Sequence, residues 1–153
     1  MRVSARNVFE GTVKSVLKGL VNAQITLVLQ GGETIIAVIT NTSADLLELK
    51  EGKSAYAIIK ASEVMIGKDL VEGTLSARNI LAGKITNLHP GAVNSEIEVT
   101  LQGGAIVIAT ITNESVKTLG LVVEDKVSAI VKASNVLIGV LSAISILLRC
   151  HIA

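Results

Sequence analysis

Hydrophobic and polar residues alternate along two segments of the chain, residues 21–30 and 93–102. In the first segment the inward positions of this alternation are Val21, Ala23, Ile25, Leu27 and Leu29. The second segment alternates in the same way between Val93 and Gln102. A period of two residues is typical of a β-strand with one buried and one solvated face. Both segments are therefore predicted to be strands.

The residues after the first of these strands predict a short series of further elements. Gln30-Gly31-Gly32-Glu33 predicts a hairpin turn, because paired glycines supply the positive φ that such turns need. Residues 34–40 predict the returning strand, 43–52 one or two helical turns closed by Gly52, and 54–67 a last long strand. Several short strands and one small helix in about 70 residues indicate a small closed barrel of OB-like type.

The whole pattern occurs twice, with a constant offset of 72 residues. Residues 4–67 and 76–139 align without a gap and are identical at 29 of 64 positions. The fold class is therefore predicted as all-β with one short helix per repeat, arranged as two tandem OB-like β-barrels. The join at 68–74 is short, so we expect the two halves to pack closely. Units this small bury a modest core, which favours further assembly into an oligomer.

Composition and charge exclude several classes of protein. Half of the residues are apolar but only Phe9 and Tyr56 are aromatic, and the formal net charge is +1. The core must be built from Val, Ile, Leu and Ala, and a nucleic-acid binder's basic surface is missing. The single cysteine, Cys150, allows no disulfide framework and no cysteine-based metal site. No signal peptide is recognisable, and the longest apolar stretch is too short to cross a bilayer. We therefore expect a cytoplasmic protein with no membrane partner.

Three polar clusters return in both copies, at Ser4-Ala5-Arg6, Thr40-Asn41-Thr42-Ser43 and Lys60-Ala61-Ser62 in the first. Together they offer hydroxyls, backbone N–H groups, a guanidinium and an ammonium, which are mostly hydrogen-bond donors. Such a set suits a small, fully deprotonated oxyanion, and Arg and Lys would balance a divalent charge. Each cluster alone could equally be a surface arginine, a strand end or a helix N-cap. Their joint repetition favours a binding site.

The shared pattern SARN, QGG, ITN.S and KAS.V.IG resembles the molbindin (Mop) domain, also called the TOBE domain. Two copies resemble the di-Mop molbindins of bacteria. The resemblance implies domains at 1–68 and 73–140, with 141–153 as a tail outside the repeat. It also implies a cytoplasmic protein that binds molybdate, and tungstate, for molybdenum storage and homeostasis. Similar proteins form trimers, and a homotrimer is expected here.

The resemblance also assigns site residues by matching position. One wall would consist of Ser4, Arg6, Lys60, Ala61 and Ser62, with Thr40 and Ser43 reaching in from a neighbouring domain. The second wall would consist of Ser76, Arg78, Lys132, Ala133 and Ser134, faced by Thr112 and Ser115. Glu114 replaces Thr42 in the second copy, and a carboxylate close to the anion would weaken that site or point away from it. Residues for a site on the threefold axis are not assigned.

Other functions lack their usual residues. The alternative of an OB-type single-stranded nucleic-acid-binding module would need aromatic platforms and a basic groove. An enzyme would need a nucleophile–base pair, clustered carboxylates or metal ligands, and none of these recurs in both halves, so no catalytic residue and no direct metal ligand is predicted. A transport ATPase would need a phosphate-binding loop and a regulator a helix-turn-helix. Cys150-His151 is interpreted as an incidental neighbour pair in the tail.

Overall fold

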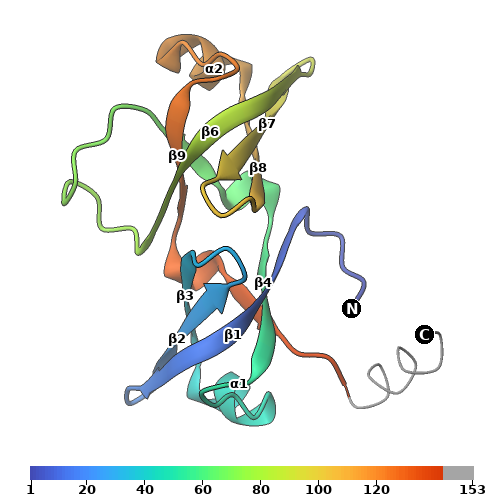
Figure 1. Cartoon of the computed structure of the whole chain (residues 1–153), viewed down its shortest axis with the longest axis vertical. Helices are drawn as coiled ribbons and strands as arrows, with labels where there is room; N and C mark the ends of the chain where they lie inside the picture. The colour runs from blue at the N-terminus through green and yellow to red at the C-terminus, as the bar shows by residue number, and fades with distance from the viewer. Residues whose placement is uncertain (143–153) are drawn as a thin grey trace.

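The computed structural model describes residues 1–142 and contains two five-stranded β-sheets (Figure 1). The first repeat forms β1 (Asn7–Lys18), β2 (Asn22–Leu29), β3 (Thr34–Thr40), α1 (Asn41–Leu46), β4 (Ser54–Ile59), the 3₁₀ turn η1 (Ala61–Glu63) and β5 (Met65–Gly67). The second forms β6 (Asn79–Pro90), β7 (Asn94–Leu101), β8 (Ile106–Thr112), α2 (Asn113–Leu119), β9 (Lys126–Val131), η2 (Ala133–Asn135) and β10 (Leu137–Gly139). The predicted all-β fold of two OB-like barrels is confirmed.

The predicted alternation is present in the hairpin strands. In β2 every second side chain from Ala23 to Leu29 is buried, and β7 shows the same pattern. Successive side chains of a strand point to opposite faces, so these residues line the barrel interiors. The largest fully buried side chains of residues 1–142 are all Ile, Leu or Val, as the composition predicted.

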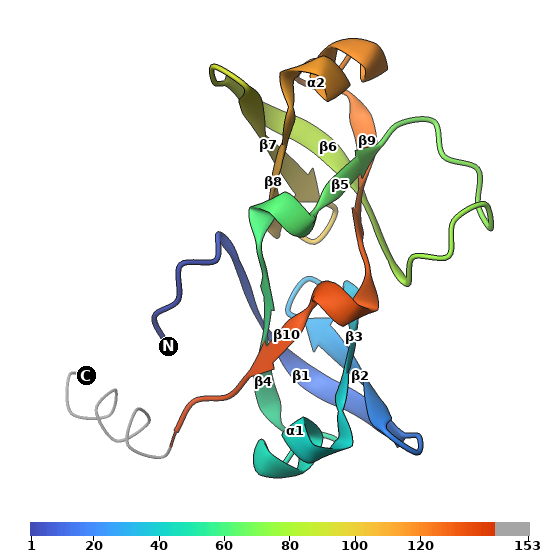
Figure 2. The ribbon, with the colours of Figure 1, turned by 180° about the vertical axis from the view of Figure 1, so that it is seen from behind.

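The last strand of each repeat belongs to the sheet of the other repeat. The strand orders are β10-β4-β1-β2-β3 and β5-β9-β6-β7-β8. Met65 of β5 lies opposite Ile130 of β9, and Leu137 of β10 lies opposite Ile58 of β4. Figure 2 shows the chain passing from β4 through η1 to β5, and from β9 back to β10. The two halves are therefore packed together closely, as the short join predicted.

The prediction of one long strand over 54–67 was wrong. The segment contains two strands, because η1 redirects the chain between them. The N–H of Glu63 donates to the carbonyl of Lys60 at 3.0 Å, and that of Val64 to Ala61 at 3.3 Å. This turn carries the chain out of the first barrel, and Ile66 is then buried against the second.

The short helix begins and ends earlier than predicted. Helix α1 starts at Asn41 because the hydroxyl oxygen of Thr40 caps it, accepting the N–H of Ser43 at 3.0 Å. It ends at Leu46, not at Gly52, since Glu48 has a φ of 50° that no helix can contain. Gly52 lies in the following turn with a φ of 86°.

Side-chain bonds and a close approach of two turns also hold the barrels together, besides the exchanged strands. The buried side chain of Asn7 bonds to the backbone of Ile108, and that of Asn79 to Ile36. The two Gly-Gly hairpin turns also meet, so closely that a Cβ on Gly31 would lie 2.7 Å from the Cα of Gly103. Among residues 1–142 no helix is long and apolar enough to cross a membrane. The tail residues Cys150 and His151 lie outside the described residues.

Candidate functional site

Five predicted site residues line one cavity of about 440 Å³ between the two barrels. They are Ser76, Arg78, Lys132, Ala133 and Ser134. Val38 of β3 and Met65 of β5 complete the wall from the first repeat. The structure therefore brings the second predicted wall together, and adds side chains from the other repeat to it.

Two anchored segments position these residues. The first segment ends at Asn79, which is 2% exposed and whose carboxamide makes two hydrogen bonds to the backbone of Ile36. These bonds hold the preceding residues, Ser76 and Arg78, at the edge of the cavity. The second is η2, which packs against β3 and whose Ala133 is buried. Because these anchors are buried, the exposed side chains of Lys132 and Ser134 project from a rigid base.

The cavity is positively charged. None of the residues that line it is Asp or Glu. The guanidinium of Arg78 makes one hydrogen bond, from Nη1 to the neutral Oε1 of Gln24 at 3.2 Å. Within residues 1–142, the ammonium of Lys132 has no hydrogen-bond or ion-pair partner. Two cations without a counter-charge, together with serine hydroxyls, form a donor set for an anion.

The predicted hydroxyls of the first repeat lie beside this cavity. Thr40 and Ser43 line a neighbouring cavity of about 450 Å³ that also includes Ser134 and Val38. The sequence grouped Thr40 and Ser43 with the first wall, reached from a neighbouring domain. Within one chain they share a cavity with Ser134 of the second wall instead, because the strand exchange places η2 against β3.

The first predicted wall is arranged like the second, but its arginine has a different partner. Ser4, Lys60 and Ser62 are exposed, and Ala61 is buried at the start of η1, which packs against β8. The guanidinium of Arg6 forms a two-pronged ion pair with Glu96, at 2.7 and 3.1 Å. Unlike Arg78, this arginine is already neutralised by a carboxylate.

The remaining predicted residues belong to the second helix. Thr112 caps α2, its hydroxyl oxygen accepting the N–H of Ser115 at 3.1 Å. Glu114 is exposed in the first turn of α2. The helix beside the wall with Lys132 is α1, whose first turn has no acidic residue.

Sequence reasoning did not identify four residues around these walls. Asn7 and Asn79 fix the segments that carry the two arginines, and Gln24 and Glu96 contact the arginines themselves. The signal for the asparagines was their place in the repeated SARN motif. Gln24 and Glu96 occupy matching positions of the repeat. A difference between two polar residues on a solvated strand face does not indicate that either contacts an arginine of the other repeat.

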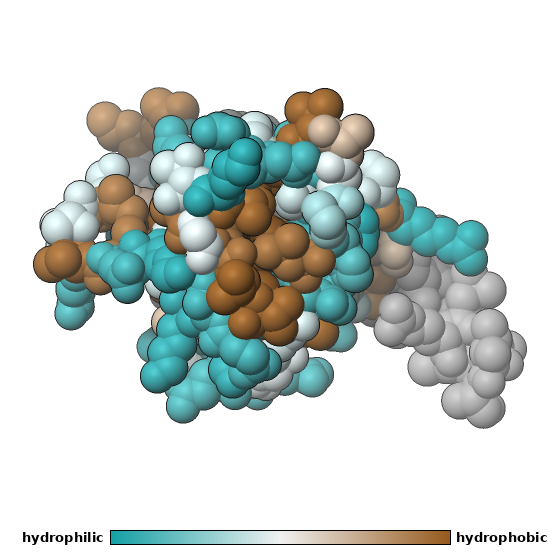
Figure 3. Space-filling view, turned by 90° about the horizontal axis from the view of Figure 1, so that it is seen from above, coloured by the Kyte–Doolittle hydropathy of each residue, from teal (hydrophilic) through white to brown (hydrophobic). Residues whose placement is uncertain are grey.

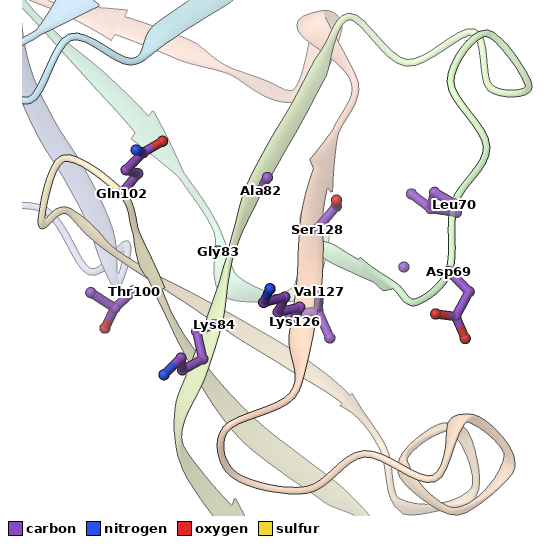
Figure 4. Close-up of a pocket in the computed structure, with 11 residues that line it drawn as sticks. Asp69, Leu70, Ala82, Gly83, Lys84, Thr100, Gln102, Lys126, Val127 and Ser128 are labelled. Carbon is purple, nitrogen blue, oxygen red and sulfur yellow. The ribbon is translucent and has the colours of Figure 1, made fainter.

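Another cavity, of about 500 Å³, lies between β6, β9 and the segment after β5 (Figure 4). Lys84, Lys126 and Asp69 line it, and Lys84 is paired with Glu124 at 2.6 Å. Its charges are therefore balanced, and it contains none of the predicted site residues. In the described part of the chain, no group of three His, Cys, Asp or Glu side chains could hold a metal ion.

Several curated proteins are similar to this chain over most of its length. The molybdenum transport protein ModE of Herbaspirillum seropedicae is 38% identical over 140 residues, which cover 92% of this chain and 52% of that protein. The molybdenum-pterin-binding protein MopA of Rhodobacter capsulatus is 39% identical over 139 residues, covering 91% of this chain and 52% of that protein. The chain spans about half the length of these relatives.

A solved structure is similar over the same region. It is that of the cytoplasmic molybdate-binding protein ModG with molybdate bound, and it shares 45% sequence identity with this chain. The TM-score is 0.89, and the alignment covers 92% of this chain and all of the other. At this identity the likeness extends beyond the fold to the sequence of both repeats.

The sequence pattern of the TOBE domain matches the chain twice, at residues 3–66 and 75–138. The matches fall on the two repeats and together include most of the described residues. The resemblance stated from the SARN, QGG and KAS motifs is thus confirmed, and the chain belongs to the TOBE domain family, with two copies of the domain in tandem.

Proposed function

We propose that this chain binds molybdate as a small oxyanion and does not catalyse a reaction. The observation that carries the proposal is the cavity in which Arg78 and Lys132 stand together without any acidic lining residue. An anion in this cavity would meet the two positive charges of Arg78 and Lys132 and the hydroxyls of Ser76 and Ser134. The structure of ModG, at 45% identity, contains molybdate, which supports the choice of ligand.

The donor set also predicts selectivity against phosphate. Molybdate is fully deprotonated near neutral pH, whereas hydrogen phosphate keeps a proton that needs an acceptor. Because no carboxylate lines the cavity, no anionic acceptor is present for that proton, which favours molybdate over hydrogen phosphate. Tungstate has the same charge and shape as molybdate, so it should bind as well.

We infer further that the chain assembles, as a homotrimer. Val8, Ile58 and Leu137 lie side by side across β1, β4 and β10, and Ile80, Ile130 and Met65 form the matching row in the other sheet. The outer members are well exposed, with Met65 at 51% and Leu137 at 58%. Because Met65 and Ile130 also line the Arg78 cavity, a subunit packed on this row would close the cavity.

Other apolar side chains are exposed at the end of the second barrel. Figure 3 looks down on this end and shows hydrophobic surface among polar side chains. Val122 and Val123, which follow α2, are 59% and 48% exposed. Exposed apolar surface of this kind favours contact with a further protein surface.

Storage of molybdenum in the cytoplasm is the role that we propose for such an assembly. The repeats at 1–68 and 73–140 would act as the two domains of each subunit. The hydroxyl-bearing residues assigned from the sequence, including Ser4, Thr40, Ser43, Thr112 and Ser115, would donate to the anion at domain or subunit contacts, beside the Arg and Lys side chains and the backbone N–H groups of Ala61 and Ala133. Neither nucleic acid nor a membrane is needed as a partner for this function.

The test is metal content after loading. The full chain is incubated with molybdate and an excess of sulfate and phosphate, desalted, and analysed for molybdenum per chain by mass spectrometry, with its oligomeric mass measured by light scattering. Retention of molybdenum on a defined trimer is the expected result. A protein that retains no molybdenum under these conditions would overturn the proposal.

A further inference from the structure

The two arginines of the repeated SARN motif have partners of different charge. Arg6 donates through Nη1 and Nη2 to the carboxylate of Glu96, at 2.7 and 3.1 Å. Arg78, which is 72 positions further along, donates through Nη1 to the amide oxygen of Gln24 at 3.2 Å. Gln24 and Glu96 are themselves 72 positions apart, so each arginine contacts the matching residue of the opposite repeat.

The surrounding scaffold is the same in both places. The carboxamides of Asn7 and Asn79 anchor the two segments that carry the arginines. Each donates to a backbone carbonyl of the other repeat at 2.8 Å and accepts a backbone N–H at 2.7 Å. Lys60 and Lys132 have nearly equal backbone angles, φ −67° and ψ 138° against φ −66° and ψ 137°. In the described part of the chain, neither lysine's ammonium group has a hydrogen-bond or ion-pair partner. The backbone scaffold is thus alike, and the walls differ in their charged neighbours: Glu96 contacts Arg6 where Gln24 contacts Arg78, and η1 ends on Glu63 where η2 ends on Asn135.

This difference decides how much positive charge an anion can meet. Beside Gln24, Arg78 keeps its full charge, and with Lys132 it offers two positive charges to a dianion. Beside Glu96, the charge of Arg6 is cancelled by a bidentate partner, and only Lys60 remains. A dianion there would have to displace a carboxylate from a charge-assisted bond and then lie close to it, which Coulomb repulsion opposes.

We infer that the two repeats hold unequal oxyanion sites, and that residues 24 and 96 set the inequality. The wall with Arg78, Lys132 and Ser134 is the strong site, and the wall with Arg6, Lys60 and Ser62 is closed by Glu96. This inference rests on the proposed function, because it concerns the same ligand. It adds that the chain fills its two walls at different molybdate concentrations.

The first arm of the test removes each lysine in turn. Molybdate binding to the full chain is measured by titration calorimetry, with molybdenum counted by mass spectrometry at each saturation step. Lys132→Ala is expected to weaken the tight phase by at least roughly tenfold, the loss of about one charge-assisted bond. Lys60→Ala is expected to change only the weak phase. Lys50→Ala, an exposed lysine outside both walls, is the matched control for lost charge.

The second arm exchanges the two partners of the arginines. Glu96→Gln copies the strong wall onto the weak one and should tighten the weak phase by roughly tenfold. Gln24→Glu copies the weak wall onto the strong one and should weaken the tight phase by a similar factor. Both residues lie on partly exposed strand faces, so circular dichroism and thermal melting should show an unchanged fold.

The outcomes separate this inference from the proposed function. Equal effects of Lys60→Ala and Lys132→Ala, with molybdate still bound tightly, would overturn the inequality and leave molybdate binding intact. No response to either exchange in a protein that binds molybdate would overturn the role of residues 24 and 96. A wild-type chain that binds no molybdate at all would overturn the proposed function, and the inequality with it.

Discussion

The carboxamide of Asn7 bonds to Ile108 of the opposite barrel as a strand neighbour would. Its Nδ2 donates to the carbonyl of Ile108 at 2.8 Å, and its Oδ1 accepts the N–H of Ile108 at 2.7 Å. Asn79 makes the same pair of bonds with Ile36. One side chain therefore satisfies both backbone groups of a residue in the outermost strand of the other sheet, and ties the barrels together.

Removing one of these carboxamides should destabilise the whole chain. Asn79→Ala leaves the N–H and carbonyl of Ile36 without their partner in a partly buried contact. The expected loss is about 1–3 kcal/mol in the free energy of unfolding, measured by urea denaturation. Asn22→Ala, at an exposed position of β2, is the control and should change that free energy by less than about 0.5 kcal/mol. Equal losses would mean that the bonds of Asn79 contribute nothing specific.

The meeting of the two hairpin turns should tolerate no side chain. A Cβ on Gly103 would lie 2.6 Å from the Cα of Gly31, a contact that only backbone movement can relieve. Gly103→Ala is expected to cost about 1–3 kcal/mol in the free energy of unfolding.

Gly19→Ala is the control for this turn, because the nearest atom there, the carbonyl oxygen of Asn22, is 3.2 Å away. Denaturant titrations of both variants are compared with the wild type. If Gly103→Ala is as stable as Gly19→Ala, the close approach of the turns does not hold the barrels together.

Replacing both lysines of the proposed walls should weaken anion binding without unfolding the protein. The side chains of Lys60 and Lys132 are exposed, and within the described part of the chain their ammonium groups have no hydrogen-bond or ion-pair partner. The double alanine variant should therefore melt like the wild type, while its affinity for molybdate falls by at least roughly tenfold. Calorimetric titration measures the affinity. Unchanged molybdate uptake would mean that both lysines are ordinary surface residues.

Asp125 provides a test of electrostatics away from the site. The hydrogen bond from Lys68, at 2.9 Å, and the N–H of Val122 hold the pKa of the Asp125 carboxyl below its ordinary value. A carboxyl whose folded pKa is lowered stabilises the protein above its unfolded pKa, and this contribution disappears as the pH falls through the folded pKa.

Carbon-detected NMR titration should therefore show Asp125 titrating below a free aspartate. In Lys68→Met the pKa of Asp125 should move back towards the ordinary value. The acid-induced loss of stability should also be smaller in Asp125→Asn than in the wild type. A titration of Asp125 that does not respond to Lys68→Met would contradict the assigned cause.

The elements that could be predicted from the sequence are those set by local physics. The alternation in β2 and β7, the Gly-Gly turns and the aliphatic core follow from period and composition, and the structure contains them. The start of helix α1 was missed by two residues because the cap, Thr40, belongs to the preceding strand, and its end by six because Glu48 has a positive φ. Local sequence signals were thus sufficient to predict the strands, turns and core of the barrels, and less so to predict where the short helix begins and ends.

The exchange of last strands could not be predicted, because the repeat hides it. Residues 65–67 and 137–139 read Met-Ile-Gly and Leu-Ile-Gly, so either strand fits beside β4 or β9. The choice depends on the direction in which η1 and η2 aim the chain. For the same reason, the residues of each wall could be selected from the repeated motifs, but their partners across the barrels could not be assigned.

The exchange also sets an order of events during synthesis. The first barrel has β4 at its edge until residues 137–139 have left the ribosome, some 70 residues after β5. At ordinary elongation rates this takes on the order of ten seconds, during which the open edge is available for pairing with other chains. Completion of the first half therefore depends on the end of the second, so the chain is expected to become resistant to proteases in one late step rather than barrel by barrel.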